Sequence, residues 1–141
     1  MSKLQAVWEL YKSLLRAGHI NEWGNLWSDN CVFEVAYPRG GVPEEKRDKQ
    51  AILSFFSPNP GERIEIDFKN DLVHVTTDPN VGFITFEFNA KIESSGYQYK
   101  NRIVIKITLE KEGNEQEGKI KELIEYADPI ARQCFFQALG I

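Results

Sequence analysis

Segments in which apolar and polar residues alternate dominate the second half of the chain. They comprise residues 63–76, 81–92, 97–110 and 119–127. A period of two is typical of a strand that buries one face and exposes the other. The alternation in the first segment breaks at Asn70-Asp71, and Ser94-Ser95-Gly96 is a hairpin turn between two later segments. We therefore expect a long antiparallel meander, whose apolar face needs a second layer to cover it.

The first half of the chain has mainly helical spacing of its apolar residues. We expect helices over residues 3–17, 21–28 and 49–57, and a strand over residues 31–37. Gly18 ends the first helix, and Asn21 and Asp48 are the expected N-caps of the second and third. Ser28-Asp29-Asn30 forms a turn before the strand, and Pro58-Asn59-Pro60-Gly61 stops the third helix.

A fourth helix is expected at the end of the sequence. Asp128 followed by Pro129 is the pattern of an N-cap with proline at the first helical position. Asp128 therefore has a structural role that requires no catalysis. The apolar stripe predicted for this helix consists of Ile130, Cys134, Phe135, Ala138 and Leu139.

Composition makes several classes of function poor candidates. Seventeen basic and 21 acidic residues give a formal charge of −4 without a basic stripe, which argues against nucleic acid as a partner. The run Lys46-Arg47-Asp48-Lys49 is interpreted as the solvated start of a helix. His19 and His74 are isolated and Cys31 is far from Cys134, so we expect no metal site and two buried free thiols.

The chain is long enough for one domain, which we expect to span residues 1–141. It has no apolar run of membrane-spanning length, and its first residues lack the apolar core of a signal peptide. We therefore expect a cytoplasmic protein that has no membrane partner.

Helices placed before and within a long antiparallel sheet predict an α+β fold with the helices on one face of a curved sheet. A strongly curved sheet closed by helices makes a cone, and concave aromatic interiors are common sites for small molecules. Aromatic residues make up 12% of the chain, which is enough to line a cavity as well as to fill a core.

The order of these elements resembles the nuclear transport factor 2-like fold, a cystatin-like α+β roll, and within it the SnoaL-like group that includes polyketide cyclases and ketosteroid isomerase-like proteins. The stretches that carry the resemblance are the Trp23/Trp27 helix, Tyr37-Pro38, the turn Thr77-Asp78-Pro79-Asn80, the return Gly96-Tyr97 to Asn101, and Gly118-Lys119-Ile120 leading into IEYADPI. Within the group, the phenazine-biosynthesis A/B-type proteins share the DPN turn, the Gly-Tyr to Asn return and the closing GKIK strand.

The phenazine-type resemblance implies a pocket with a glutamate on the last strand, immediately before an aromatic residue. That position is Glu125, before Tyr126. It also implies a serine and a histidine on the helix after the first loop, which fall on Ser57 and Leu53. Leucine in place of histidine puts the phenazine-type condensation in doubt, and Ser57 has the alternative role of ending a helix.

Alternation does not decide which way Glu125 points, because neither face of its strand is cleanly apolar. In solvent it would be an ordinary surface acid, whereas in an aromatic pocket desolvation would raise its pKa and suit it to proton transfer. Asn101 lies among apolar residues and would bind either a ligand or neighbouring backbone. His74 would act as a base only if it pointed into the cone.

Further candidates for the cavity wall are aromatic, and each of them is equally suited to the core: Trp8, Tyr11, Trp27, Phe33, Tyr37 and Phe56.

Two functions follow from these expectations. The first is a cofactor-independent isomerase, cyclase or hydratase that binds an apolar, cyclic small molecule and uses Glu125 as acid or base, with Asn101 and Tyr37 orienting the ligand. The second is a non-catalytic module that binds a ligand or forms a dimer. The fold also implies a homodimer, formed through the outer face of the sheet.

Overall fold

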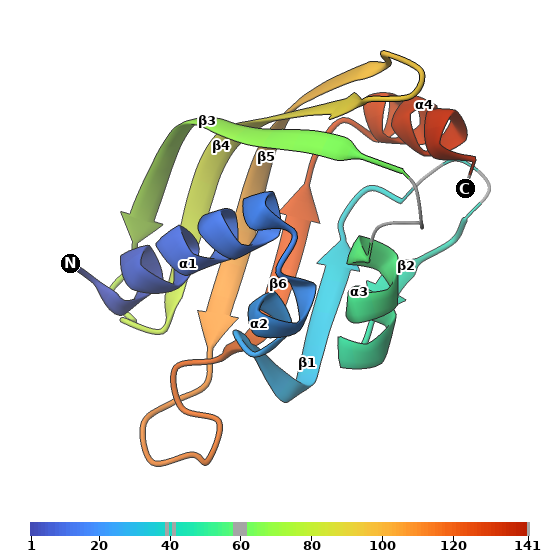
Figure 1. The fold of residues 1–141 in the computed structure, drawn as a ribbon. Helices are drawn as coiled ribbons and strands as arrows, with labels where there is room; N and C mark the ends of the chain where they lie inside the picture. The colour runs from blue at the N-terminus through green and yellow to red at the C-terminus, as the bar shows by residue number, and fades with distance from the viewer. Residues whose placement is uncertain (39, 41, 58–61, 141) are drawn as a thin grey trace.

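The computed structural model describes residues 1–38, 40, 42–57 and 62–140, so the expected stop at residues 58–61 lies outside it. Figure 1 shows helices gathered on the concave side of one curved sheet. The elements in chain order are α1 (Lys3–Ala17), α2 (Ile20–Gly24), β1 (Trp27–Val35), β2 (Glu45–Arg47), α3 (Lys49–Phe56), β3 (Ile64–Val75), β4 (Val81–Ile92), β5 (Gln98–Leu109), β6 (Ile120–Tyr126) and α4 (Pro129–Leu139).

The sheet has the strand order β2-β1-β6-β5-β4-β3 and does not close on itself. The expected meander of β3, β4, β5 and β6 is confirmed. The sheet is mixed rather than wholly antiparallel, because β6 pairs in parallel with β1 and antiparallel with β5. β6 therefore joins the meander to the β1–β2 pair and lies in the interior of the sheet.

Local irregularities accompany the curvature of the sheet. The register of β3 against β4 shifts between Lys69 and Leu72, where Asn70 adopts a φ of 54°. This bulge is the break expected from the alternation at Asn70-Asp71. A second shift, between Trp27 and Val32, falls in β1. Bulges of this kind bend the strand that carries them and increase its twist.

α1 has the bounds that the sequence predicts. The Ser2 hydroxyl accepts from the Gln5 amide at 3.1 Å, and Gly18, with a φ of 76°, ends the helix. Leu4, Trp8 and Tyr11 are the buried side of the helix. Gly82 permits the close approach of α1 to β4, because a Cβ there would lie 2.6 Å from the Leu4 Cδ1.

The second helix is shorter than expected, and the expected turn at residues 28–30 is part of a strand. α2 ends at Gly24, and His19 takes the N-cap position expected for Asn21. β1 begins at Trp27, because the first residue of β6 pairs with this segment: the Ile120 amide donates to the Leu26 carbonyl at 2.8 Å. Pairing with a distant strand thus overrides the local helical pattern. The sequence of this segment alone gives no sign of that pairing.

The segment before α3 also differs from expectation. The run 46–49 is expected at the solvated start of a helix. Lys46 and Asp48 are exposed and Lys49 begins α3, but Glu45–Arg47 form β2, an edge strand antiparallel to β1. Asp48 keeps its expected role as N-cap, since its carboxylate accepts from the Ala51 amide at 2.9 Å. Glu45, immediately before this run, is buried.

α4 buries a different stripe from the one predicted. Asp128 caps it as expected, accepting from the Ile130 amide at 2.9 Å. Ile130 and Cys134 are exposed, so the expectation of two buried thiols is correct only for Cys31. The stripe that the helix buries is Arg132, Phe135 and Phe136.

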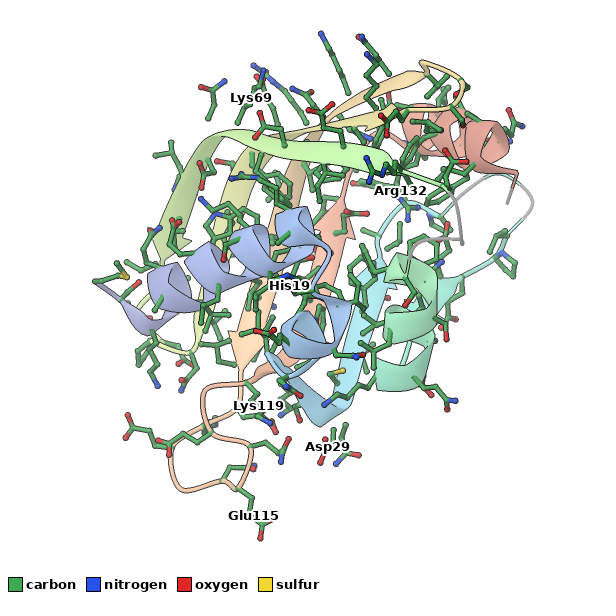
Figure 2. All side chains as sticks on the ribbon, viewed as in Figure 1. His19, Asp29, Lys69, Glu115, Lys119 and Arg132 are labelled. Carbon is green, nitrogen blue, oxygen red and sulfur yellow. The ribbon has the colours of Figure 1, made fainter. Side chains whose placement is uncertain are left out.

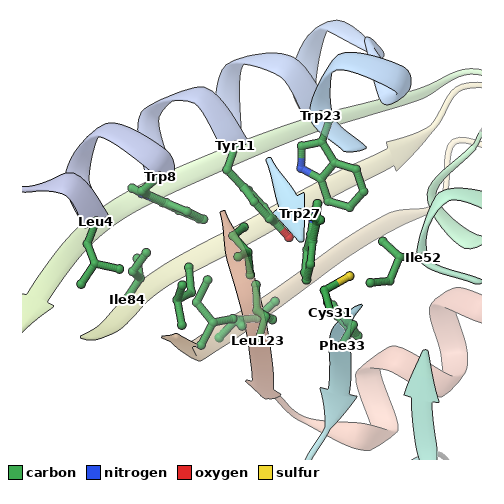
Figure 3. Close-up of a cluster of buried hydrophobic side chains, with 14 of the residues drawn as sticks. Leu4, Trp8, Tyr11, Trp23, Trp27, Cys31, Phe33, Ile52, Ile84 and Leu123 are labelled. Carbon is green, nitrogen blue, oxygen red and sulfur yellow. The ribbon is translucent and has the colours of Figure 1, made fainter. Parts of the chain in front are cut away.

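An aromatic cluster fills the space between α1, α2 and the sheet (Figure 3). Trp23 packs edge-on against Trp27 and Tyr11, with ring centroids 5.6 and 5.4 Å apart. Trp8 stacks on Tyr11 at 5.3 Å. These rings make one end of the cone solid and leave its other end for a cavity. In the part of the chain that the structure describes, no helix is long and apolar enough to cross a membrane.

Candidate active site

A cavity of about 1080 Å³ lies between the concave face of the sheet and the helices. α1, α3 and α4 each contribute residues to its wall, together with β1 and the strands of the meander. Aromatic rings form much of the wall, among them Tyr11, Phe33, Phe56, Phe88, Tyr99 and Phe135. This volume is slightly above the usual range for ligand pockets, roughly 300–1,000 Å³.

Glu125 projects from β6 into this cavity. Its cross-strand neighbours are Val35 on β1 and Ile105 on β5, both buried on the concave side. The next residues on either side, Ile124 and Tyr126, therefore face the convex side. The Glu125 side chain is 16% exposed. The inward direction of the Glu125 side chain follows from the strands that pair with β6 on both sides. The residue pattern of β6 alone carries no information about these partners.

Arg132 of α4 holds the Glu125 carboxylate. Its Nε lies 3.2 Å from the Glu125 Oε2, and its Nη1 lies 3.2 Å from the Oε1 of Glu45. The Nη2 of Arg47 lies 3.4 Å from the other oxygen of Glu45. Figure 2 labels Arg132 where α4 approaches the beginning of β3. Two acids and two guanidiniums from β2, β6 and α4 thus meet at one end of the cavity.

Burial raises the pKa of Glu125 above its ordinary value. The positive charge of Arg132 opposes this rise in pKa, while the negative charge of Glu45 adds to it. Burial is the largest of these causes, because an apolar wall solvates a carboxylate poorly. A carboxyl whose pKa moves toward neutrality suits proton transfer better than an ordinary glutamate does.

Two tyrosines lie close to this acid. Tyr11 reaches the cavity from α1 and Tyr99 from β5. Burial, with a further contribution from the charge of Glu125, raises the pKa of both phenols, so both remain protonated hydrogen-bond donors at neutral pH. Tyr99 also accepts from the Asn101 Nδ2 at 2.7 Å and stacks on Phe135, with ring centroids 4.4 Å apart.

The cavity wall includes Glu125 and four of the other residues singled out from the sequence, which are Tyr11, Phe33, Phe56 and Ser57. The Ser57 hydroxyl donates to the Leu53 carbonyl at 2.6 Å. It therefore already has an acceptor in the last turn of α3.

Asn101 is buried beneath the cavity wall and binds the backbone. Its Nδ2 donates to the Asp128 carbonyl at 3.2 Å, and its Oδ1 accepts from the Asp128 amide at 3.1 Å. Of the two alternatives for Asn101, a ligand or neighbouring backbone, its side-chain amide thus binds the backbone. Asn101 fixes the point at which β6 gives way to α4, and hence the position of Arg132 relative to Glu125.

The other residues named from the sequence lie outside the wall. Trp8 and Trp27 are wholly buried in the aromatic cluster. Leu53 packs on α2, close to Gly24. His74 and Tyr37 lie on the outer side of the sheet, where the His74 Nε2 is 3.3 Å from the Thr85 Oγ1 and the Tyr37 ring contacts Tyr126.

Sequence reasoning missed Arg132, Glu45 and Arg47. A signal for Arg132 was present, since Arg132, Phe135, Phe136 and Leu139 recur at helical spacing and all line the cavity. An arginine inside an aromatic stripe indicates a buried acid as its partner. No comparable signal marks Glu45. Among the described residues, no three His, Cys, Asp or Glu side chains gather as a metal site.

Comparison with known proteins finds structures that share this fold. No protein-family model matches the chain. A curated relative, the uncharacterized protein YesE of Bacillus subtilis, is 23% identical over 111 residues, which cover 79% of this chain and 71% of YesE. A presumed isomerase from Bacillus subtilis has a TM-score of 0.77 and 20% identity, covering 97% of this chain and 96% of its own.

Two mycobacterial structures are also similar. The Δ5-3-ketosteroid isomerase of Mycobacterium sp. has a TM-score of 0.70 and 18% identity, covering 93% of this chain and 97% of its own. RV0760c from Mycobacterium tuberculosis, solved in complex with estradiol-17β-hemisuccinate, has a TM-score of 0.69 and 16% identity, covering 89% and 93%. The narrower resemblance to phenazine-biosynthesis proteins stays a prediction. The chain has the nuclear transport factor 2-like fold that ketosteroid isomerase and SnoaL-like polyketide cyclases share.

Proposed function

We propose that this protein is a cofactor-independent enzyme that binds a largely apolar, cyclic small molecule and catalyses an isomerisation, cyclisation or hydration by acid/base chemistry. The observation that carries the proposal is the position of Glu125, a carboxyl with a raised pKa in the wall of an aromatic cavity. Structural relatives that act on or bind steroids support an apolar, cyclic ligand.

An isomerisation at this site needs only the movement of a proton. The Glu125 carboxylate takes a proton from the carbon next to a ligand carbonyl, and the electron pair of the broken C–H bond moves toward the carbonyl oxygen. The Tyr11 hydroxyl donates a hydrogen bond to that oxygen as its negative charge develops. Glu125 then returns the proton to the same or to a conjugated carbon, which regenerates the acid/base pair. Arg132 keeps the carboxyl oriented throughout.

Deuterium exchange tests this proposal before the natural substrate is known. A panel of apolar cyclic ketones and enones, steroids among them, is incubated with the protein in D₂O and examined by mass spectrometry. We expect the wild type to introduce deuterium beside the carbonyl of at least one compound, and the variant Glu125→Gln to lose this exchange. Glu115→Gln, which changes an exposed acid in the loop between β5 and β6, is the control.

The alternative is a binding module without catalysis. It is favoured by the close pairing of Glu125 with Arg132, at 3.2 Å, because an ion-paired carboxylate is a weaker base. Leucine at position 53, where the phenazine-type proteins have histidine, favours it as well. Saturable binding of a panel compound by the wild type, with no exchange above that of Glu125→Gln, would establish this alternative.

We also propose that two copies pair through the convex face of the sheet. Several large apolar side chains are exposed on it, including Val32, Leu72, Phe83 and Val104. Lys69 points away from the helices on the same side (Figure 2).

The charges on this face support a second copy as the occupant. Glu34 and Lys106 flank Ile124 as its cross-strand neighbours on the two sides. A two-fold axis along β6 would therefore set Glu34 of one protomer against Lys106 of the partner subunit, with apolar side chains between these charges.

A further inference from the structure

Residues of β2 and α4 meet Glu125 of β6 in a buried ion network. The side chains of Glu45 and Arg132 are 3% and 5% exposed. Arg132 contacts Glu125 through Nε and Glu45 through Nη1, each at 3.2 Å. Arg47 contacts the second oxygen of Glu45 at 3.4 Å. Within the described part of the chain, Arg132 is the side chain that bridges the two acids.

Aromatic faces restrict the movement of both guanidiniums. Arg132 lies over the ring of Phe136, 4.8 Å from its centroid, and Arg47 lies over Phe55 at 3.8 Å. A planar guanidinium that is stacked on a ring presents its donors in fixed directions. Arg132 therefore cannot turn both edges toward Glu125 without leaving Glu45, and its charge is divided between two carboxylates.

We propose that Glu45 is a positioning residue that acts on Glu125 through Arg132, by holding one edge of the guanidinium away from the cavity acid. The inference rests on the proposed role of Glu125 in proton transfer. Glu45 does not line the cavity and so has no direct part in the chemistry. With Glu45 in place, Arg132 contacts Glu125 through Nε alone, while its Nη1 contacts Glu45.

The charged and titratable groups around Glu125 agree with this role. Arg132 on α4 and Arg47 on β2 lower its pKa, while Glu45 on β2 raises it. The phenols of Tyr11 on α1 and Tyr99 on β5 are neutral, because burial raises the pKa of each. Glu45 is thus the neighbouring group that opposes the two guanidiniums. Removing its charge would leave Glu125 more firmly ionised and a poorer proton acceptor.

A titration of Glu125 by ¹³C NMR of its carboxyl carbon tests the proposal and needs no substrate. We expect Glu45→Gln to lower the pKa of Glu125, because Gln keeps the shape of the side chain and removes the charge. Glu115→Gln removes an exposed acid from the loop between β5 and β6, outside the cavity wall, and is the control. A Glu125 titration shifted no further by Glu45→Gln than by Glu115→Gln would overturn the proposal.

Arg132→Lys provides an independent measurement. Lysine keeps the charge and loses the planar fork, so one ammonium replaces the two separate contacts. We expect the effect of Glu45→Gln on the Glu125 titration to be smaller in the Arg132→Lys background, as a double-mutant cycle would reveal. An equal effect in both backgrounds would show that Arg132 does not transmit it. Should Glu45→Gln fail to fold, Glu45→Asp, which withdraws the carboxylate by one methylene, is expected to shift the titration in the same direction.

The outcomes separate this inference from the proposed function. If Glu125→Gln abolishes deuterium exchange and Glu45→Gln leaves the titration unchanged, the enzyme assignment stands and the role of Glu45 fails. If the titration responds to Glu45 and no ligand undergoes exchange, the network acts as described here but the proposed catalysis fails. If the role of Glu45 were merely structural, Glu45→Gln would lower the free energy of unfolding without moving the Glu125 titration.

Discussion

The indole Nε1 of Trp8 donates to the Oδ2 of Asp71 at 2.7 Å, and this bond joins α1 to the bulge in β3. The same oxygen accepts from the Lys12 Nζ at 2.6 Å. Burial opposes ionisation of Asp71, but the hydrogen bonds from Lys12 and Trp8 outweigh it and lower the pKa of the carboxyl. The bulge thus presents an acid where the helix offers two donors.

Replacing Asp71 by Asn is expected to lower the free energy of unfolding by about 1–2 kcal/mol at neutral pH, because a charge-assisted bond and an ion pair are lost. The folded-state pKa of Asp71 is depressed, so its stabilisation is full above the ordinary value of 3.8 and disappears as the pH falls through the folded value. The difference between wild type and variant should therefore shrink in acid. Urea unfolding across this pH range measures it.

Asp67→Asn is the control for this prediction. Asp67 lies on the same strand and pairs with Arg16 at 3.5 Å, but both side chains are about half exposed. Exposed pairs contribute little, so we expect a change below about 0.5 kcal/mol. Equal losses in the two variants would contradict the special role of the bulge.

Asn101→Leu is expected to destabilise the protein by about 2 kcal/mol or more, because it removes the hydrogen bonds of Asn101 with the buried Tyr99 hydroxyl and the Asp128 amide. The Asp128 carbonyl also loses Asn101 but keeps its bond from the Arg132 amide. Because Asp128 begins α4, the variant should also loosen the contact between Arg132 and Glu125. Thermal unfolding measures the first effect and the Glu125 titration the second. Asn89→Leu, on the outer side of β4, should change neither.

The raised pKa of Glu125 predicts how stability depends on pH. Above the ordinary value of 4.5 the folded state holds a proton that the unfolded state has released, so stability falls as the pH rises through the folded-state value. In Glu125→Gln this part of the dependence should be absent. Denaturant unfolding of both proteins from acid to neutral pH gives the slope of the free energy of unfolding against pH for each. Identical slopes would show that Glu125 has an ordinary pKa.

Tyr11→Phe removes one hydroxyl from the cavity wall and leaves the ring in its place. If this hydroxyl stabilises a developing oxyanion, the exchange rate of a bound ketone should fall roughly 10²-fold, with little change in the affinity for the ketone. A Tyr11→Phe variant that binds more weakly but exchanges at the wild-type rate would assign Tyr11 to ligand binding alone. Fluorescence titration and mass spectrometry measure the two quantities separately.

The proposed dimer is tested by charge reversal. Light scattering after size exclusion should give twice the chain mass for the wild type. Glu34→Lys and Lys106→Glu should each weaken the dimer, and the double variant should restore it, because the opposite charges then meet again across the axis. A wild-type monomer, or single variants that dimerise as well as the wild type, would count against this interface.

Patterns local in sequence predicted most of the fold. The alternation of residues 81–92 and 97–110 gave two long strands with the correct bounds to within one residue, and the caps Asp48 and Asp128 began helices as expected. The failures involve pairing between distant segments. β2 exists because Glu45–Arg47 lies beside β1, and Trp27 is a strand residue because Ile120 pairs with it.

The candidate site divides in the same way. Resemblance indicated Glu125, and the helical pattern placed Tyr11 on the apolar side of its helix. The direction of Glu125 was undetermined, since it depends on the neighbours of β6 on both sides. Arg132 was overlooked because the stripe predicted for the last helix contained only apolar residues, Ile130 and Cys134 among them. Arg132 is buried instead because it pairs with two buried acids, Glu45 and Glu125.

The place of β6 in the strand order has a consequence for how the chain is made. The ribosome synthesises all the other strands before β6. Until β6 arrives, the β1–β2 pair has no strand pairing with the β3–β5 meander. Until then two sheet edges, on β1 and β5, present unsatisfied backbone groups to chaperones or to other chains. Glu125 enters its apolar surroundings in the same event that covers those edges, so a partly synthesised chain has neither the complete sheet nor the acid in place.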